Sequence, residues 1–235
     1  MTRSTRDRIA HVFSRNPWFA RQTPALRTRI FELAQVSSVE AGHWVYDAGD
    51  EARGLYGVLE GSVRILAWLE RSGYRLANIS GEGEIFGYAG RSVRGRRQLT
   101  AVTREPSQLV YVPEHALATL AHEFPDFWQS FAELATSQLQ LVVHVLVETL
   151  NLPPDALIAS RLAQLASLPR VRAAGDGIAI HLTQQETGEL TGLSRKTVNQ
   201  VLNRLEEGGY ITRRYGEILV HDIAGLFAIA ESEDE

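Results

Sequence analysis

Five polar side chains suited to reading nucleic-acid bases lie close together towards the C-terminus. If residues 195–205 form an α-helix, in which successive residues turn by about 100°, these five fall within one arc of roughly 140° and the apolar residues fall opposite. Arginine and lysine donate to guanine edges in the major groove of DNA, and asparagine and glutamine pair with adenine edges. The pattern therefore predicts a helix that reads DNA bases. Its exposed arc comprises Arg195, Lys196, Asn199, Gln200 and Asn203.

The residues before this helix predict a helix-turn-helix. Thr183, with Glu186 three residues later, has the pattern of a capping box, which begins a helix that runs to about Thr191. Gly192 then makes a tight turn, and Ser194 caps the second helix. An ordinary amphipathic helix with a solvated face would explain the polar arc, but not this succession of cap, turn and cap.

A basic hairpin is expected after the second helix. Gly208 and Gly209 end that helix, and the segment YITRRYGEILVHD predicts two strands joined at Tyr215-Gly216. Arg213 and Arg214 on the first strand are expected to meet DNA phosphates. From residue 194 to 216 there are five basic residues against two acidic ones, so this region is locally positive, as DNA binding requires.

The whole chain has the composition of a globular protein. Of its 235 residues, 44% are hydrophobic, and the net charge of −4 means that any contact with DNA depends on a local patch. Because the chain has no cysteine, a disulfide framework, a thiolate metal site and a cysteine nucleophile are excluded. The longest apolar run, LVVHVLV at 141–147, is far shorter than the ~18 residues of a membrane span. We expect a cytoplasmic protein that contacts no membrane.

Two further patterns lie upstream. Residues 36–113 have short apolar runs punctuated by glycines, which predicts an antiparallel β unit, and residues 125–150 have apolar residues at helical spacing. One stripe of this long helix contains Leu139, Val142 and Leu146, and another contains Leu134, Leu141 and Val145. Since a surface helix needs only one buried stripe, we expect the other to pack against a second copy, forming a homodimer. The alternative is a single buried core helix. Asn151-Leu-Pro-Pro154 ends the helix and is the expected hinge.

The segment LTQQETGELTGLSRKTVNQVLNRLEEGGYI (182–211) resembles the winged helix of the CRP/FNR family of bacterial transcription regulators. The glycine-punctuated segments between residues 41 and 87 resemble that family's cyclic-nucleotide-binding-type β-roll. The resemblance covers about residues 19–226 and implies an α+β fold: an N-terminal antiparallel β-roll of the jelly-roll type, a long dimerisation helix and a C-terminal winged helix-turn-helix. The implied domains are an effector domain at 1–124, the dimerisation helix and hinge at 125–152, and the DNA-binding domain at 153–235.

The resemblance also implies how the second helix reads DNA. The family's recognition helix commonly begins Ser-Arg, matched by Ser194 and Arg195, and the arginine reads a guanine. Lys196 and Gln200 stand where the family often has Glu and Arg, so we expect a different operator. The candidate DNA-binding residues are Thr183, Ser194, Arg195, Lys196, Thr197, Asn199, Gln200 and Arg213.

The positions that resemble the family's nucleotide cassette depart from its pattern. Tyr88 stands where the family has the glutamate that holds the ribose, and Leu99 where it has the arginine that pairs with the cyclic phosphate. We therefore expect no control by cyclic AMP, and a pocket that is empty or holds an apolar or aromatic ligand. Alternatively, Arg96 or Arg97 takes over the phosphate, but their loop, GRSVRGRR, is typical of a solvated or DNA-approaching turn. The candidate pocket residues are Gly87, Tyr88, Ala89, Arg97, Leu99, Thr100 and Val142.

The chain has no set of residues with the spacing of a catalytic site, and its seven histidines are not at metal-ligand spacing. We expect a protein that is not an enzyme. The resemblance leaves a haem-based gas sensor as an alternative, with His144 as the candidate ligand. The expected partners are double-stranded DNA, a second copy of the chain and RNA polymerase, while the identity and existence of a small-molecule effector stay open.

Overall fold

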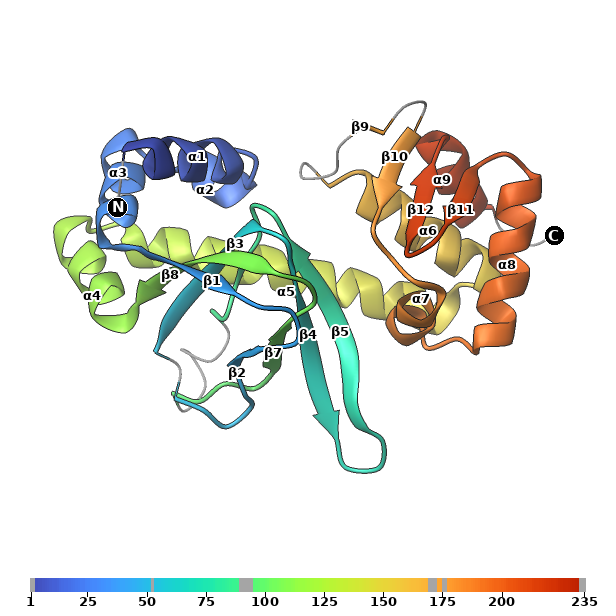
Figure 1. The fold of residues 1–235 in the computed structure, drawn as a ribbon, viewed down its shortest axis with the longest axis horizontal. Helices are drawn as coiled ribbons and strands as arrows, with labels where there is room; N and C mark the ends of the chain where they lie inside the picture. The colour runs from blue at the N-terminus through green and yellow to red at the C-terminus, as the bar shows by residue number, and fades with distance from the viewer. Residues whose placement is uncertain (1–2, 52, 89–94, 169–172, 175–176, 233–235) are drawn as a thin grey trace. The chain divides into compact units, whose positions relative to one another are not determined.

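The computed structural model describes residues 3–51, 53–88, 95–168, 173–174 and 177–232 (Figure 1). Its contacts divide the chain into two compact units, Met1–Leu139 and Gln140–Glu235. The boundary falls inside one long helix, α5 (Phe127–Asn151), so the two halves of this helix belong to different units.

In the N-terminal unit, short helices precede and follow a set of strands. Proline begins α2 and α3, and each is capped by the side chain just before it: Asn16 accepts from Phe19 N, and Thr23 accepts from Leu26 N. The helices are α1 (Arg3–Phe13), α2 (Pro17–Arg21), α3 (Pro24–Leu33) and α4 (Glu114–Glu123). The strands are β1 (Gln35–Val39), β2 (Trp44–Tyr46), β3 (Gly54–Glu60), β4 (Ser62–Leu69), β5 (Gly73–Gly81), β6 (Ile85–Phe86), β7 (Thr100–Thr103) and β8 (Ser107–Pro113).

These strands form two antiparallel sheets, with orders β1-β8-β3-β6 and β2-β7-β4-β5. Because side chains alternate along a strand, each sheet has an inner face and an outer face. Val58 of β3 and Leu109 of β8 pack inward with Val63 and Ala101 of the other sheet, whereas Leu59 packs outward. The two sheets therefore enclose an inner core, which makes the unit a β-roll.

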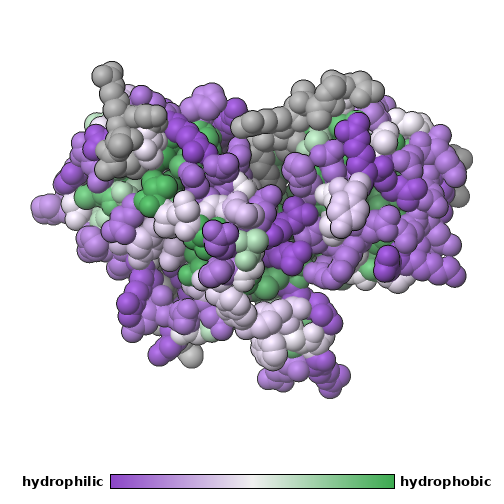
Figure 2. Space-filling model, viewed as in Figure 1, coloured by the Kyte–Doolittle hydropathy of each residue, from purple (hydrophilic) through white to green (hydrophobic). Residues whose placement is uncertain are grey.

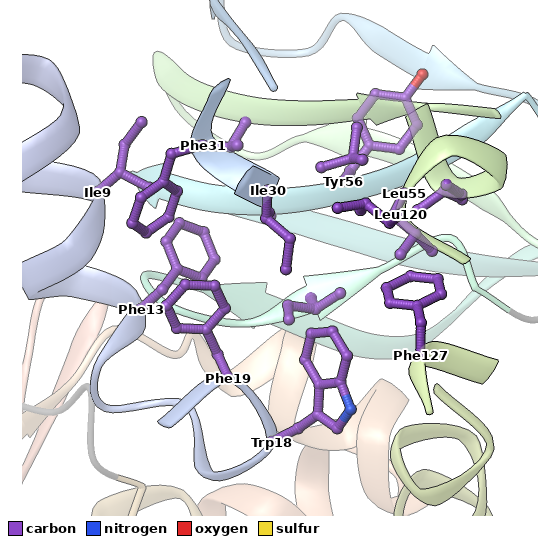
Figure 3. Close-up of a pocket in the computed structure, with 15 residues that line it drawn as sticks. Ile9, Phe13, Trp18, Phe19, Ile30, Phe31, Leu55, Tyr56, Leu120 and Phe127 are labelled. Carbon is purple, nitrogen blue, oxygen red and sulfur yellow. The ribbon is translucent and has the colours of Figure 1, made fainter. Parts of the chain in front are cut away.

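A second core lies between the outer face of sheet β1-β8-β3-β6 and the helices α1 to α5. It contains a cavity of about 50 Å³ whose wall is almost wholly apolar, with Phe13, Phe19, Leu55, Leu120 and Phe127 among its lining residues (Figure 3). A cavity with such a wall is expected to stay dry. Among the described residues predicted for the effector pocket, none lines this cavity.

Helix α5 is buried only near its start. Phe127, Phe131 and Leu134 pack into the outer core, but Leu139 and Val142 are 62% and 61% exposed, which excludes a core helix buried along its length. By length and composition alone, α5 is apolar enough to cross a membrane, a property that the short apolar runs of the sequence did not predict. The exposed large apolar residues of its second half are Leu139, Leu141, Val142, Val143, Leu146, Val147 and Leu150.

The C-terminal unit combines helices with a small antiparallel sheet of order β11-β12-β10-β9. Its core includes Ile158, Leu162, Val198, Leu202 and Leu226, none of them exposed. Its elements after α5 are α6 (Pro154–Ala166), β9 (Ala173–Ala174), β10 (Gly177–Ile180), α7 (Gln184–Thr191), α8 (Arg195–Glu207), β11 (Ile211–Arg214), β12 (Glu217–Val220) and α9 (Ile223–Glu231). The predicted α+β fold, with a β-roll, a long helix and a winged helix-turn-helix, is confirmed.

Candidate nucleic-acid interface and effector pocket

The predicted caps fix the start of both helices in the helix-turn-helix. Thr183 Oγ1 accepts from Glu186 N at 3.1 Å, and the Glu186 carboxylate accepts from Thr183 N at 2.9 Å, which completes the capping box. Gly192 ends α7 in the left-handed region at φ +71°, where a side chain would be strained. Ser194 Oγ then accepts from Thr197 N at 3.1 Å and begins α8.

Helix α8 presents a polar face. Val198, Val201 and Leu202 are fully buried on one side, and Leu205 is nearly so. In Figure 2 the surface over α8 is largely hydrophilic. The exposed residues of the predicted reading arc are Arg195, Lys196, Gln200 and Asn203, whereas Asn199 is half-buried. The side-chain oxygen of Asn199 is buried and accepts no hydrogen bond from the described residues.

Four of the eight predicted DNA-binding residues are already engaged within the protein. The hydroxyls of Thr183 and Ser194 serve as caps, and Thr197 Oγ1 lies 2.9 Å from Ser194 Oγ. Arg213 Nε donates to the Glu206 carboxylate at 2.8 Å, and Arg213 N donates to the same carboxylate at 2.7 Å. Each of these four residues therefore has a structural contact within the protein, whatever it contributes to DNA binding.

Two family models cover these regions. A model described as a Crp-like helix-turn-helix domain matches residues 158–229, and a model described as a cyclic nucleotide-binding domain matches residues 36–124. The first spans the capped helix pair with its hairpin, and the second spans the roll, in the predicted order. The chain belongs to the CRP/FNR family of transcription regulators.

Individual CRP/FNR proteins are similar over most of the chain. The cAMP-activated global transcriptional regulator CRP of Pasteurella multocida is 27% identical over 74% of this chain and 84% of its own length. The CRP-like cAMP-activated regulator of Mycobacterium tuberculosis is 24% identical over 90% of this chain and 95% of its own length. The second comparison, over 212 residues, is long enough to include both the roll and the helix-turn-helix.

Solved structures of CRP/FNR proteins share the fold. A CRP/FNR family transcriptional regulator from Thermus thermophilus is 25% identical, with a TM-score of 0.67 over 84% of this chain and 99% of that chain. FixK2 from Bradyrhizobium japonicum has a TM-score of 0.74 at 18% identity, over 86% and 99% of the two chains. At such identity the second likeness supports the fold alone.

In the CRP/FNR roll of this chain, Arg97 does not take the solvated or DNA-approaching position that its loop predicted. Its side chain is 3% exposed rather than solvated, because its guanidinium turns into the roll and donates to the carbonyl oxygens of Gly87 and, at 2.8 Å, Gly54. It also lies 4.3 Å from the ring centre of Tyr46 and 5.6 Å from that of Tyr56. Carbonyl oxygens and aromatic faces thus offset the loss of water around the cation. No described residue accepts a hydrogen bond from its Nε.

The other predicted pocket residues are divided between several surroundings. Tyr88 packs against the outer core, and burial raises its pKa to about 12. Leu99 packs against the inner core, and Thr100 Oγ1 accepts from Ala48 N at 3.1 Å. Ala89 lies outside the described residues, and Val142 is exposed on the second half of α5. Of the described residues predicted for the pocket, Gly87 is the one whose carbonyl oxygen accepts a hydrogen bond from Arg97.

A polar cluster that the sequence did not predict joins the end of α5 to α6. The Glu148 carboxylate is mostly buried and accepts from Ser160 Oγ at 2.5 Å and from Gln164 Nε2 at 2.8 Å. Arg161 lies 3.8 Å away, and burial lowers the pKa of its guanidinium. His144 Nε2 lies 3.2 Å from the same carboxylate. A carboxylate in the last turn of a helix is unfavourable by itself. The position of Glu148 near the end of the predicted helix was therefore the one hint in the sequence that it has partners.

Proposed function

We propose that this CRP/FNR protein acts as a homodimer, binds an inverted-repeat operator through α8 and regulates transcription without control by cyclic AMP. The observation that carries base reading is the exposed arc of α8, where Arg195, Lys196 and Gln200 project without a carboxylate among them. Such side chains donate to guanine and adenine edges in the major groove. Lys196 and Gln200 support an operator different from that of family members with Glu and Arg there.

Support for the dimer comes from the second half of α5. Its large apolar side chains, such as Leu139 and Leu146, are 62% and 54% exposed in the single chain. An apolar patch of this kind marks a protein interface, and a second copy of the same helix offers a matching surface. A two-fold dimer carries two recognition helices, so we expect half-sites about one helical turn apart, roughly 10 base pairs from centre to centre.

The experiment for this proposal selects the DNA that the protein binds and measures the mass of the protein in solution. The purified full chain is mixed with random-sequence duplexes, and the retained fragments are sequenced; we expect an inverted repeat. The double variant Leu139→Glu/Val142→Glu puts charges on the exposed helix face, so we expect a monomer that loses the selected operator. An unchanged dimer mass in solution for this variant, or a retained sequence with one unpaired half-site, would contradict the proposal.

Cyclic nucleotides form the second part of the proposal. The similar CRP proteins are named as cAMP-activated, but here Leu99 stands where their family has the phosphate-binding arginine, and Arg97 already donates to two carbonyl oxygens. A buried phosphate without a bidentate partner costs several kcal/mol. We expect no micromolar binding of cyclic AMP or cyclic GMP by calorimetry. Micromolar binding that Arg97→Ala removes would establish the alternative, in which Arg97 has taken over the phosphate.

A partner, RNA polymerase, and a location, the cytoplasm, complete the proposal. A transcription regulator of this family acts on RNA polymerase in the cytoplasm, and we extend both statements to this chain, leaving the effector open. For a haem-based alternative, the residues of the single chain do not fit: His144 is 64% exposed and turns its Nε2 to Glu148, and no described element encloses it. No step of the mechanism is therefore assigned to a haem.

A further inference from the structure

An ion pair joins the hairpin that follows α8, formed by β11 and β12, to that helix. Glu206, in the last turn of α8, accepts from Arg213 N at 2.7 Å and from Arg213 Nε at 2.8 Å, and its carboxylate lies 2.7 Å from Arg213 Nη2. The backbone hydrogen bond from Arg213, and then its guanidinium, hold the pKa of Glu206 below its usual value. A carboxylate at a helix C-terminus is otherwise unfavourable, and these bonds offset that cost for Glu206.

This ion pair engages Arg213, one of the two arginines that the sequence assigned to DNA phosphates. The side chains of Arg213 and Glu206 are 29% and 31% exposed, so both are partly withdrawn from the surface. Arg214, the next residue, is 55% exposed and contacts Glu217 only at 3.5 Å. On this hairpin, Arg214 rather than Arg213 is the cation available to a partner.

Tyr215 stands at the tip of the same hairpin. It follows Arg214 in the turn between the strands, where Gly216 has φ +70°, and Arg214 pairs with Glu217 across the turn. Its relative exposure is 106%, so no part of the protein covers its ring, whereas the other exposed aromatic residues among the described ones lie between 37% and 56%. A large ring held wholly in water, beside the largely exposed cation of Arg214 and next to a DNA-reading helix, has the chemistry to contact a sugar and a phosphate together.

We propose that Tyr215 rests on the sugar–phosphate backbone of DNA, its ring against a deoxyribose and its hydroxyl donating to a phosphate oxygen, and that the Glu206–Arg213 pair is the strut that positions it there. The proposal rests on DNA binding by α8 and deepens it. Arg213 and Glu206 are positioning residues, Tyr215 and Arg214 are the contacting ones, and neither contact reads the base sequence.

The first test separates an uncharged backbone contact from a charged one. Binding of the full chain is measured by fluorescence anisotropy on a random-sequence 30-base-pair duplex and on a selected operator, at several salt concentrations. Tyr215→Ala is expected to weaken both by about tenfold without changing the salt slope, because no counterion contact is lost. Tyr215→Phe should recover part of that loss. The comparison variant Arg214→Ala should instead reduce the slope by about one.

In the second test, removal of two neighbouring carboxylates is expected to change DNA affinity in opposite directions. Removing a carboxylate near DNA reduces repulsion and so strengthens binding, which is the result expected for the control Glu207→Ala, an exposed neighbour on the same helical turn. If Glu206 is a strut, Glu206→Ala should weaken binding to both duplexes about tenfold in spite of that gain. Glu206→Ala combined with Tyr215→Ala should then be little weaker than either single variant, since both act through one contact.

The outcomes distinguish this inference from the proposed function. If the unaltered chain binds neither duplex, the proposed function fails. If it binds and Tyr215→Ala binds equally well, or if Glu206→Ala strengthens binding as Glu207→Ala does, the inference on the hairpin is overturned while base reading by α8 stands. The thermal unfolding midpoint of each variant is expected to lie within a few degrees of that of the unaltered chain. This control shows that a loss of binding does not come from a loss of folding.

Discussion

The helix-turn-helix and the interior of the β-roll differ in how far apart in sequence their contacts lie. In the helix-turn-helix, Thr183 bonds to Glu186 and Ser194 bonds to Thr197, each only three residues away. In the roll, the guanidinium of Arg97 bonds to Gly87 and Gly54, which are 10 and 43 residues away. The comparison teaches that a motif built from near neighbours can be predicted from the sequence, whereas the inward direction of a single side chain cannot.

The largest effect expected from this comparison concerns Arg97. Arg97→Ala leaves the carbonyls of Gly87 and Gly54 without their donor and opens space beside Tyr46, so we expect a loss of about 3 kcal/mol in the unfolding free energy. The four tryptophans all precede residue 129, so tryptophan fluorescence during urea unfolding reports on the N-terminal unit. The exposed neighbour Arg96 is the control, and Arg96→Ala should change stability by less than about 0.5 kcal/mol. Equal effects of the two variants would mean that the buried contacts of Arg97 contribute nothing.

A smaller effect, on binding rather than folding, is expected from the recognition helix. Arg195 is exposed one residue past the cap, where a recognition helix reaches into the groove, so we expect Arg195→Ala to cost about 1 to 3 kcal/mol on the selected operator and to relax preference at one base pair per half-site. Arg214→Ala, measured beside it, should weaken all sequences alike. If Arg195→Ala lowered the affinity for operator and scrambled duplex equally, this arginine would not read a base.

The smallest expected effect tests whether the helix-turn-helix is stabilised by contacts between near neighbours in the sequence. Thr183→Ala removes the hydroxyl that accepts from Glu186 N, and the loss of such a cap costs about 1 kcal/mol. Thermal unfolding followed by circular dichroism measures it. The matched variant Thr212→Ala alters a hydroxyl of β11 that bonds a histidine ring and caps no helix, so it should leave the start of α7 intact. A loss confined to Thr183→Ala would sharpen the contrast with Arg97, since the cap acts within a single turn.

Two carboxylates near helix ends have partners that the sequence did not predict. Glu148 and Glu206 both lie in the last turn of a helix, where a negative charge is unfavourable, and each is held by side chains from another element. The position favours a partner without guaranteeing one, since Glu207 in the last turn of α8 is exposed. Its identity, Ser160 and Gln164 in one case and Arg213 in the other, depends on which element packs beside the helix end.

The sequence by itself determined the elements whose energetics are short in range. Capping boxes, glycine turns and the 3.6-residue period of α8 act within one or two helical turns, so residues 183–216 could be predicted in detail, and so could the order of roll, long helix and winged helix. Only the tertiary structure decided where Arg97 points, that Arg213 is bound to Glu206, and which half of α5 stays exposed. These outcomes depend on carbonyls, rings and carboxylates that folding brings together from distant parts of the chain. A local sequence pattern does not predict such contacts.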